Sequence, residues 1–243
     1  MSLRSDAIRL AYANPSLRKD LLPLLKTAYS LNAGNTPLAK ARAYAEKIFK
    51  GPVEDTLPDF DKNYLRLQKA VKAAPGIPRI QMPVIEPEDI GLFQKRLTEG
   101  RLDILRPFAK GKFIKVKELD QNDGEWVDLG FEDGEDKDDV IRAQVKSIAV
   151  EKLKPTQSQI WLEKTFGNIA KFGAPKSGSR VLSTTVIVSS DGYILDGHHR
   201  YSQAMMSDPK LKMKALYVPM PIKTLLEVGR EYGEAIGNSG KQA

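Results

Sequence analysis

The sequence contains no cysteine. Disulfides, thiolate metal sites and thiol catalysis are therefore excluded, and the composition fits a reducing compartment such as the cytoplasm. No uninterrupted apolar run approaches the ~20 residues that a membrane span needs, so we expect no such span. The first residues also lack the apolar core of a secretory signal. Histidine is scarce as well: the chain has two, and they are adjacent, so any histidine chemistry must come from this one place.

The chain of 243 residues carries a formal net charge of +7. This excess of positive charge favours polyanionic partners, namely nucleic acid, nucleotides or an acidic protein surface. A basic protein whose lysines are only solvated is an equally open interpretation, since no cluster of five or more Lys or Arg residues occurs. Aromatic residues make up only 7%, and the sequence shows no evident platform for base stacking.

The excess charge lies mainly in the first 50 residues. They hold nine Lys or Arg against three Asp or Glu, and leucine and alanine recur there at helical spacing. Thr36-Pro37 is typical of a helix start and predicts a helix through about Phe49. Two interpretations stay open. The segment is either a helical hairpin packed on the main domain, or a basic arm that targets the protein or docks on a membrane surface, nucleic acid or a larger protein assembly.

Seven prolines lie in the following segment, residues 51–110, and six of them fall between residues 52 and 87. The pattern predicts helices near 60–73 and 87–98, joined by an extended stretch at 75–87. This is typical of an arm that wraps over a surface. We therefore predict a mainly helical N-terminal region and connecting arm over residues 1–110.

From residue 111 the pattern alternates between strands and helices, which predicts an α+β domain over residues 111–243. A hairpin turn is expected at Ser190-Asp191-Gly192. The expected strands are 113–117, 181–189, 193–195 and 213–218. The expected helices are 157–171, 198–206 and 222–236, with a Gly/Ser/Pro/Lys loop at 173–180 after the first of them.

One segment of this half is strongly acidic. Residues 123–139 hold nine acids and one lysine. Their order lacks the spacing and the terminal glutamate of an EF-hand calcium loop. The segment is therefore predicted to be a solvated acidic loop.

The run Asp196-Gly197-His198-His199-Arg200 concentrates chemistry directly after a predicted strand. A helix that starts at His198 would present free backbone amides at an edge of the sheet, an arrangement that binds phosphate. Gly197 permits a tight turn, Arg200 offers a forked donor, and Asp196 suits a magnesium ion or a base. The two histidines project in different directions, so one faces a ligand and the other packs. A purely structural interpretation stays open, with Asp196 as a helix cap, the histidines on the surface and Arg200 paired with an acid.

The longer run from Ser189 to Tyr201, Ser-Ser-Asp-Gly-Tyr-Ile-Leu-Asp-Gly-His-His-Arg-Tyr, resembles the signature of the ParB/sulfiredoxin superfamily. In that group a hairpin leads into a glycine turn at a helix start. The segment 153–158, Leu-Lys-Pro-Thr-Gln-Ser, resembles the first box of the family. The predicted strand and helix after the signature follow in the family's order, and the resemblance covers residues 144–237.

The resemblance implies a small α+β fold whose members bind nucleotides at this turn. ParB-type members bind CTP, sulfiredoxins use ATP, the free-serine kinases of the group carry an Asp-Gly-His-His-Arg box like this one, and some members are described as nucleases. Similar single domains are common in phages and mobile elements, so a phage-encoded protein of the host cytoplasm or virion is expected. The residues implied are Gly197, His198, His199, Arg200, Gln157 and Ser158 for the phosphates of ATP or another NTP, Asp196 for Mg²⁺, and Asp196, His198 and His199 for catalysis.

The sequence departs from the family in three respects. Without cysteine, sulfiredoxin activity is excluded. The serine kinases carry a glutamate where this chain has Gln157, and an amide cannot act as a general base, so Glu151 or Glu163 would have to substitute. About 40 residues follow the signature, fewer than the DNA reader and dimerisation tail of partition proteins occupy, so sequence-specific partition is not expected.

Two classes of function therefore stay open. The first is an NTP-binding enzyme that catalyses phosphoryl transfer or phosphodiester cleavage at the turn. The second is a non-catalytic module, nucleotide-responsive or structural, that acts through its basic helical N-terminus. Nucleic acid is a further candidate partner, through Lys171, Lys176, Arg180 and the basic N-terminus.

Overall fold

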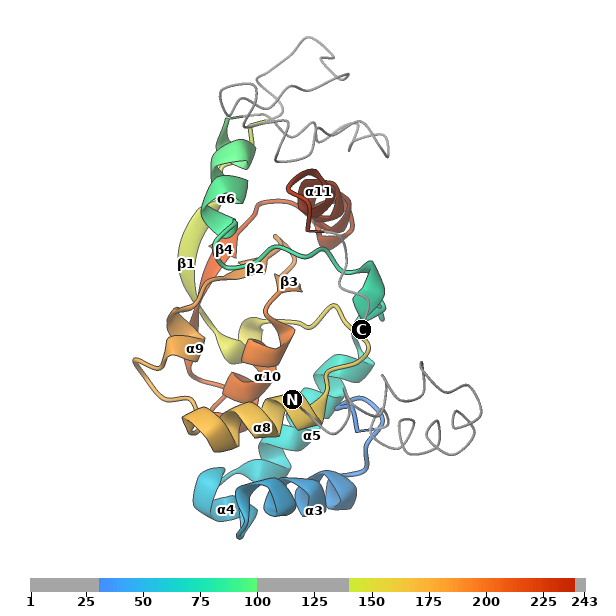
Figure 1. The fold of residues 1–243 in the computed structure, drawn as a ribbon, viewed down its shortest axis with the longest axis vertical. Helices are drawn as coiled ribbons and strands as arrows, with labels where there is room; N and C mark the ends of the chain where they lie inside the picture. Colours follow the sequence, from blue (N-terminus) through green and yellow to red (C-terminus); the bar gives the residue numbers. More distant parts are fainter. Residues whose placement is uncertain (1–30, 100–139, 239–243) are drawn as a thin grey trace, which may run out of the picture.

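The computed structural model describes residues 31–99 and 140–238 (Figure 1). The first range forms helices: α3 (Leu38–Phe49), α4 (Val53–Thr56), α5 (Phe60–Lys72), the short 3-10 helix η2 (Arg79–Gln81) and α6 (Ile90–Thr98). The second range forms β1 (Gln144–Ala149), η3 (Val150–Lys152), α8 (Leu162–Phe172), α9 (Arg180–Ser183), β2 (Val186–Val188), β3 (Ile194–Asp196), α10 (His198–Ser207), β4 (Lys212–Tyr217) and α11 (Ile222–Ala235). The predicted α+β class is confirmed.

The strands form one four-stranded sheet of mixed direction, in the order β1-β4-β2-β3. β1 and β4 are antiparallel and pair from Gln144 with Tyr217 to Ala149 with Lys212. β2 runs parallel to β4 and antiparallel to β3, with which it forms the predicted hairpin. The chain then leaves β3, turns directly into α10 and returns through β4. The start of α10 therefore lies at the end of an edge strand.

Both faces of the sheet are covered. In β2, Val186 and Val188 belong to one hydrophobic core and Ile187 to the other, because alternate side chains of a strand point to opposite faces. The first core lies among α3, α5, α8 and α10, where the Phe60 and Phe166 ring centroids are 5.7 Å apart. The second core lies under α6 and α11, which stand on the other side of the sheet in Figure 1. Each core draws on residues from both described ranges.

The N-terminal expectations agree with the structure where it describes them. The helix predicted after Thr36-Pro37 is α3, and those near 60–73 and 87–98 are α5 and α6. The stretch 75–87 is extended apart from η2. The strand at 113–117, the acidic segment and the boundary between residues 110 and 111 lie outside the described residues. Within the described ranges, no helix has the length and apolar character to cross a membrane.

Two boundaries in the second range were predicted wrongly. The strand expected at 181–189 is confined to β2, because residues 180–183 form α9. The side chains of Ser183 and Thr184 donate hydrogen bonds to the carbonyl of Arg180, and such local bonds compete with strand pairing. The helix expected from 157 begins at Leu162. The residues before it are extended, with Ile77 pairing beside Gln157 in a short parallel bridge.

Candidate functional site

The turn between β3 and α10 depends on Gly197. Its φ of +105° lies in the region that favours glycine. A Cβ at this position would lie 2.4 Å from Cγ1 of Val186, which is buried in β2. The glycine therefore lets the chain turn against the neighbouring strand and begin a ten-residue helix at His198. The first-turn amides of that helix point away from its body, as at any helix start.

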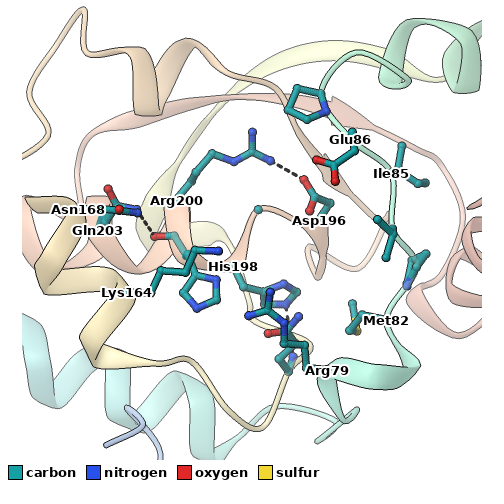
Figure 2. Close-up of a pocket in the computed structure, with 16 residues that line it drawn as sticks. Arg79, Met82, Ile85, Glu86, Lys164, Asn168, Asp196, His198, Arg200 and Gln203 are labelled. Carbon is teal, nitrogen blue, oxygen red and sulfur yellow. Dashed lines mark hydrogen bonds and ion pairs between the residues drawn. The ribbon is translucent and has the colours of Figure 1, made fainter. Parts of the chain in front are cut away.

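A hollow of about 440 Å³ opens at this helix start, and we call it the central hollow (Figure 2). Its walls come from the turn itself, from the extended residues 82–87, from the 153–158 segment and from α8. Of the residues predicted from sequence, it brings together Gln157, Asp196, Gly197, His198, His199 and Arg200. Ser158 does not line it. Ser158 lies instead beside Gly34 and Gly76.

His198 packs inward and joins the two sequence boxes. Its Nε2 accepts hydrogen bonds from the backbone amides of Thr156, at 2.9 Å, and Gln157, at 3.3 Å. The ring is 3% exposed, and burial, aided by the charge of Arg79, lowers the pKa of His198 to about 3. The imidazole is therefore neutral with its proton on Nδ1. Because both amides occupy Nε2, the predicted phosphate contact does not fit this atom, and His198 acts as a positioning residue.

His199 has a different environment. Its Nε2 is buried and has no hydrogen-bond partner among the described residues. Burial, followed by the charges of Lys164, Arg79 and His198, lowers the pKa of His199 to about 3. Its backbone carbonyl accepts a hydrogen bond from Gln203 Nε2 at 2.8 Å, which steadies the first turn of α10. A buried polar atom without a partner is costly, so Nε2 of His199 marks a place for a ligand.

Gln157 presents a second such atom. The side chain is 8% exposed, and its Oε1 is buried without a hydrogen-bond partner among the described residues. It lines the same hollow as His199. An amide oxygen accepts hydrogen bonds, so this position requires a donor such as a hydroxyl or a bound water.

Arg200 and Asp196 form an ion pair across the turn (Figure 2). Burial raises the pKa of Asp196, against the opposing effect of the Arg200 charge, and the nearby carboxylate of Glu86 raises it further. The structural interpretation that paired Arg200 with an acid is thus correct about the contact. Both side chains nonetheless line the central hollow, so the pair is part of the site.

Three charged residues of the hollow were missed by the sequence analysis. Arg79 and Glu86 come from the extended stretch before α6, more than a hundred residues before the turn, and no spacing indicated them. Lys164 lies on α8 four residues before Asn168, which also lines the hollow, and this i, i+4 polar pair on a predicted helix was an available signal. Glu151 and Glu163, considered as substitutes for Gln157, are exposed and do not line the hollow.

The charges of the hollow suit an anion held with a divalent cation. Arg79, Lys164 and Arg200 face two carboxylates, Glu86 and Asp196. In the part of the chain that the structure describes, no group of three or more acidic or histidine side chains could hold a metal alone. Mg²⁺, however, is commonly held by one or two carboxylates together with substrate phosphates. Burial is the main reason that the pKa of Asp196 is raised, and the Glu86 charge adds to it; a cation beside Asp196 would oppose both effects.

No family model, no curated protein and no solved structure matches the chain. The function of the site is therefore inferred from its residues and their geometry. The features that bear on it are the two unpartnered buried atoms, the helix start and the mixed charges of the central hollow.

Proposed function

We propose that the chain is a nucleotide-binding protein of the ParB/sulfiredoxin type, and that the central hollow holds the phosphates of an NTP such as ATP. The observation that carries this proposal is the pair of unpartnered buried atoms, Nε2 of His199 and Oε1 of Gln157, beside the start of α10. The hairpin that leads through Gly197 into α10 supports the family assignment.

Each wall of the hollow has a part in this binding. The amides at the start of α10 and the neutral imidazole of His199 offer N–H donors to phosphate oxygens. Arg79, Lys164 and Arg200 supply positive charge. Gln157 Oε1 requires a donor, and a ribose or acceptor hydroxyl provides one. Asp196 is the residue that would hold Mg²⁺, which would neutralise phosphate charge when bound.

The catalytic form of the proposal is phosphoryl transfer. The oxygen of an acceptor hydroxyl attacks the terminal phosphorus, the bond from that phosphorus to the bridging oxygen breaks, and the diphosphate leaves. Glu86 takes the hydroxyl proton, supplying the carboxylate that Gln157 cannot. Phosphodiester cleavage would use the same groups: water, deprotonated by Glu86, attacks a strand phosphorus, the bond from that phosphorus to one sugar oxygen breaks, and the sugar oxygen leaves and takes a proton from solvent.

A second candidate is a nucleotide-responsive module without catalysis. The ion pair between Arg200 and Asp196 favours it, because a bound phosphate would compete with Asp196 for the guanidinium. Binding would then release the partly buried carboxylate of Asp196 and change the turn. The two candidates share the binding step and differ only in turnover.

Calorimetric titration with ATP, CTP, GTP and ADP, with and without Mg²⁺, tests the binding step. Arg200→Ala should weaken binding by about tenfold or more, because a charge-assisted hydrogen bond is lost. Arg66→Ala is the matched control, since Arg66 is exposed on α5 away from the hollow. If no nucleotide binds, or if both variants behave alike, the proposal fails.

Turnover separates the two candidates. Glu86→Gln should lower phosphoryl transfer to an acceptor by about a hundredfold while nucleotide binding persists, as expected for loss of a general base. Glu163→Gln, at an exposed position outside the hollow, should leave the rate unchanged. Nucleotide binding without turnover in the wild-type chain would favour the non-catalytic module.

A further inference from the structure

Two further hollows continue from the central one. The second hollow, of about 520 Å³, lies between the end of α8 and α9, and it shares Asn168, Arg200 and Gln203 with the central hollow. The third hollow, of about 600 Å³, lies between the loop before α9 and the strands β1 and β4, and it shares Ser179 with the second. Figure 1 shows α9 and this loop beside the start of β4. The shared residues place the three hollows next to one another, and we call their succession the path; α9 lies between the second and the third, with Arg180 and Val181 lining one and Leu182 and Ser183 the other.

The outer part of this path is basic. Arg180 lines the second hollow, and Lys210, Lys212 and Lys214 line the third. No carboxylate lines either of them; Asp208 lies nearby and accepts a hydrogen bond from the backbone amide of Lys210. Lys212 and Lys214 are both exposed, and they alternate along β4, so they stand on one face of the sheet. Cations spaced along a path suit several phosphates in sequence better than one small anion.

An exposed aromatic ring lies on the same path. Phe172 ends α8, is 73% exposed and lines the second hollow. Lys171 Nζ lies 5.0 Å from the centroid of its ring. Aromatic rings that face solvent beside cations are the usual platforms on which unpaired bases stack. The sequence showed no such platform because the aromatic content is low; the fold nonetheless exposes one ring where the cations gather.

We propose that a single strand of nucleic acid binds along these hollows, with its backbone on Lys210, Lys212, Lys214 and Arg180 and a base stacked on Phe172. The strand leads to Arg200 and the central hollow. This deepens the proposed function, since it makes a phosphodiester strand the substrate or regulator of that site. Contact at the second and third hollows does not depend on nucleotide binding; only the contact at Arg200 rests on the proposed function.

Fluorescence anisotropy with labelled oligothymidylate and oligouridylate of about 12 nucleotides tests the basic part of the path. Lys212→Ala/Lys214→Ala should weaken binding and lower the slope of log affinity against log salt by about 1.4, or 0.7 for each contact on a single strand. Lys62→Ala/Lys69→Ala, which removes the same charge from exposed positions on α5, should change neither. Equal effects of the two double variants, or no binding at low salt, would overturn the proposal.

The aromatic contact is tested separately. Phe172→Ala should weaken binding about fivefold or more, and Phe172→Tyr, which keeps a ring, should restore it. Heparin, a polyanion without bases, should not distinguish Phe172→Ala from the wild type. If Phe172→Ala has no effect on the oligonucleotides, or if duplex DNA binds as tightly as the single strands, no base stacks there and the strand proposal is wrong. Comparing the two oligomers shows whether the strand is DNA or RNA.

The same variants separate this proposal from the proposed function. Lys212→Ala/Lys214→Ala should bind the NTP as the wild type does, because neither lysine lines the central hollow. Strand binding that survives when no NTP binds would uphold the path and reject the nucleotide site. NTP binding with no strand binding would uphold the nucleotide site and reject the path.

Discussion

The neutral state of His198 is the residue-scale feature on which the turn depends. Its Nε2 accepts two backbone amides of the 153–158 segment, and protonation would place a third donor against them. The ring therefore joins a segment far away in sequence to the turn only while it is uncharged. This makes the stability of the site depend on pH.

We expect the free energy of unfolding to fall between pH 7 and pH 5. Histidine titrates near pH 6.5 in the unfolded chain but near 3 in the folded one for His198, so the unfolded state takes up the proton first. The stability is complete above pH 6.5 and is lost as the pH falls toward 3, by about 1–2 kcal/mol at pH 5 for each such histidine. Asp196 has the opposite effect on the free energy of unfolding. Because its pKa is raised in the folded protein, the folded state takes up this proton first, which stabilises the fold as the carboxyl becomes protonated.

Urea unfolding at several pH values measures this slope. His198→Gln keeps an acceptor near the two amides but cannot take up the proton, so its stability should depend less on pH. An unchanged slope in His198→Gln would show that His198 does not hold the turn as a neutral acceptor.

Gly197 gives a second residue-scale prediction. Gly197→Ala should lower the free energy of unfolding by about 2–4 kcal/mol, because it places a Cβ at positive φ and against Val186. Gly178→Ala is the control: its φ is +84°, but no atom lies within 4 Å of the added Cβ, so only about 1–2 kcal/mol is expected. Equal losses in chemical denaturation would mean that the close approach to Val186 does not matter.

The sequence predicted that the adjacent histidines diverge, but not which of them faces the ligand. That choice depends on the amides of Thr156 and Gln157, which reach His198 only after folding. Ser158, predicted beside Gln157 in the site, faces the other way along an extended segment. Arg79 and Glu86 reach the hollow through tertiary packing, for which a single sequence carries no spacing signal.

At the scale of elements, α10 is fixed at both ends. Gly197 begins it, and near its end the side chain of Asn63 on α5 donates hydrogen bonds to the carbonyls of Met206, at 3.2 Å, and Ser207, at 3.3 Å. Carbonyls in the last turn of a helix lack partners within the helix. The N-terminal helices thus hold the element that carries the site.

Removing the hydrogen bonds from Asn63 to the end of α10 should lower the stability of the fold. Asn63→Ala leaves buried carbonyls unpaired and should lower the free energy of unfolding by about 1–3 kcal/mol. Its neighbour Lys62 is exposed, and Lys62→Ala should stay within about 0.5 kcal/mol of the wild type. Thermal unfolding of the three proteins is sufficient, and similar midpoints for all of them would contradict the role given to Asn63.

Elements with a strong period were predictable, as α3, α5, α11 and the hairpin show. The strand expected at 181–189 was too long because its β-branched residues outweighed the hydroxyls of Ser183 and Thr184, which bond to the backbone and form α9 instead. Element type followed from hydrophobic pattern, and element ends followed from local hydrogen bonds that the pattern does not contain.

For the whole molecule, the first core joins helices of residues 31–99 to the sheet and to α10. We therefore expect α5 and α10 to unfold locally as one cooperative unit, although the sequence analysis placed them in different regions, 1–110 and 111–243. Leu67→Ala on α5 should lower the opening free energies of amides in both helices by the same amount, about 2–5 kcal/mol, in native-state hydrogen exchange. A loss confined to α3 and α5 would show that they open as a separate unit.

The central claim concerns the two histidines. Nε2 of His199 is proposed to bind a phosphate, whereas Nε2 of His198 already accepts hydrogen bonds from the backbone amides of Thr156 and Gln157. Because the chain holds only two histidines, ¹⁵N-histidine NMR resolves both rings without ambiguity. On addition of ATP and Mg²⁺, the ring nitrogens of His199 should shift, while those of His198 keep the pattern of a neutral ring protonated on Nδ1. Shifts at His198 alone, or none at either ring with saturating nucleotide, would contradict the account.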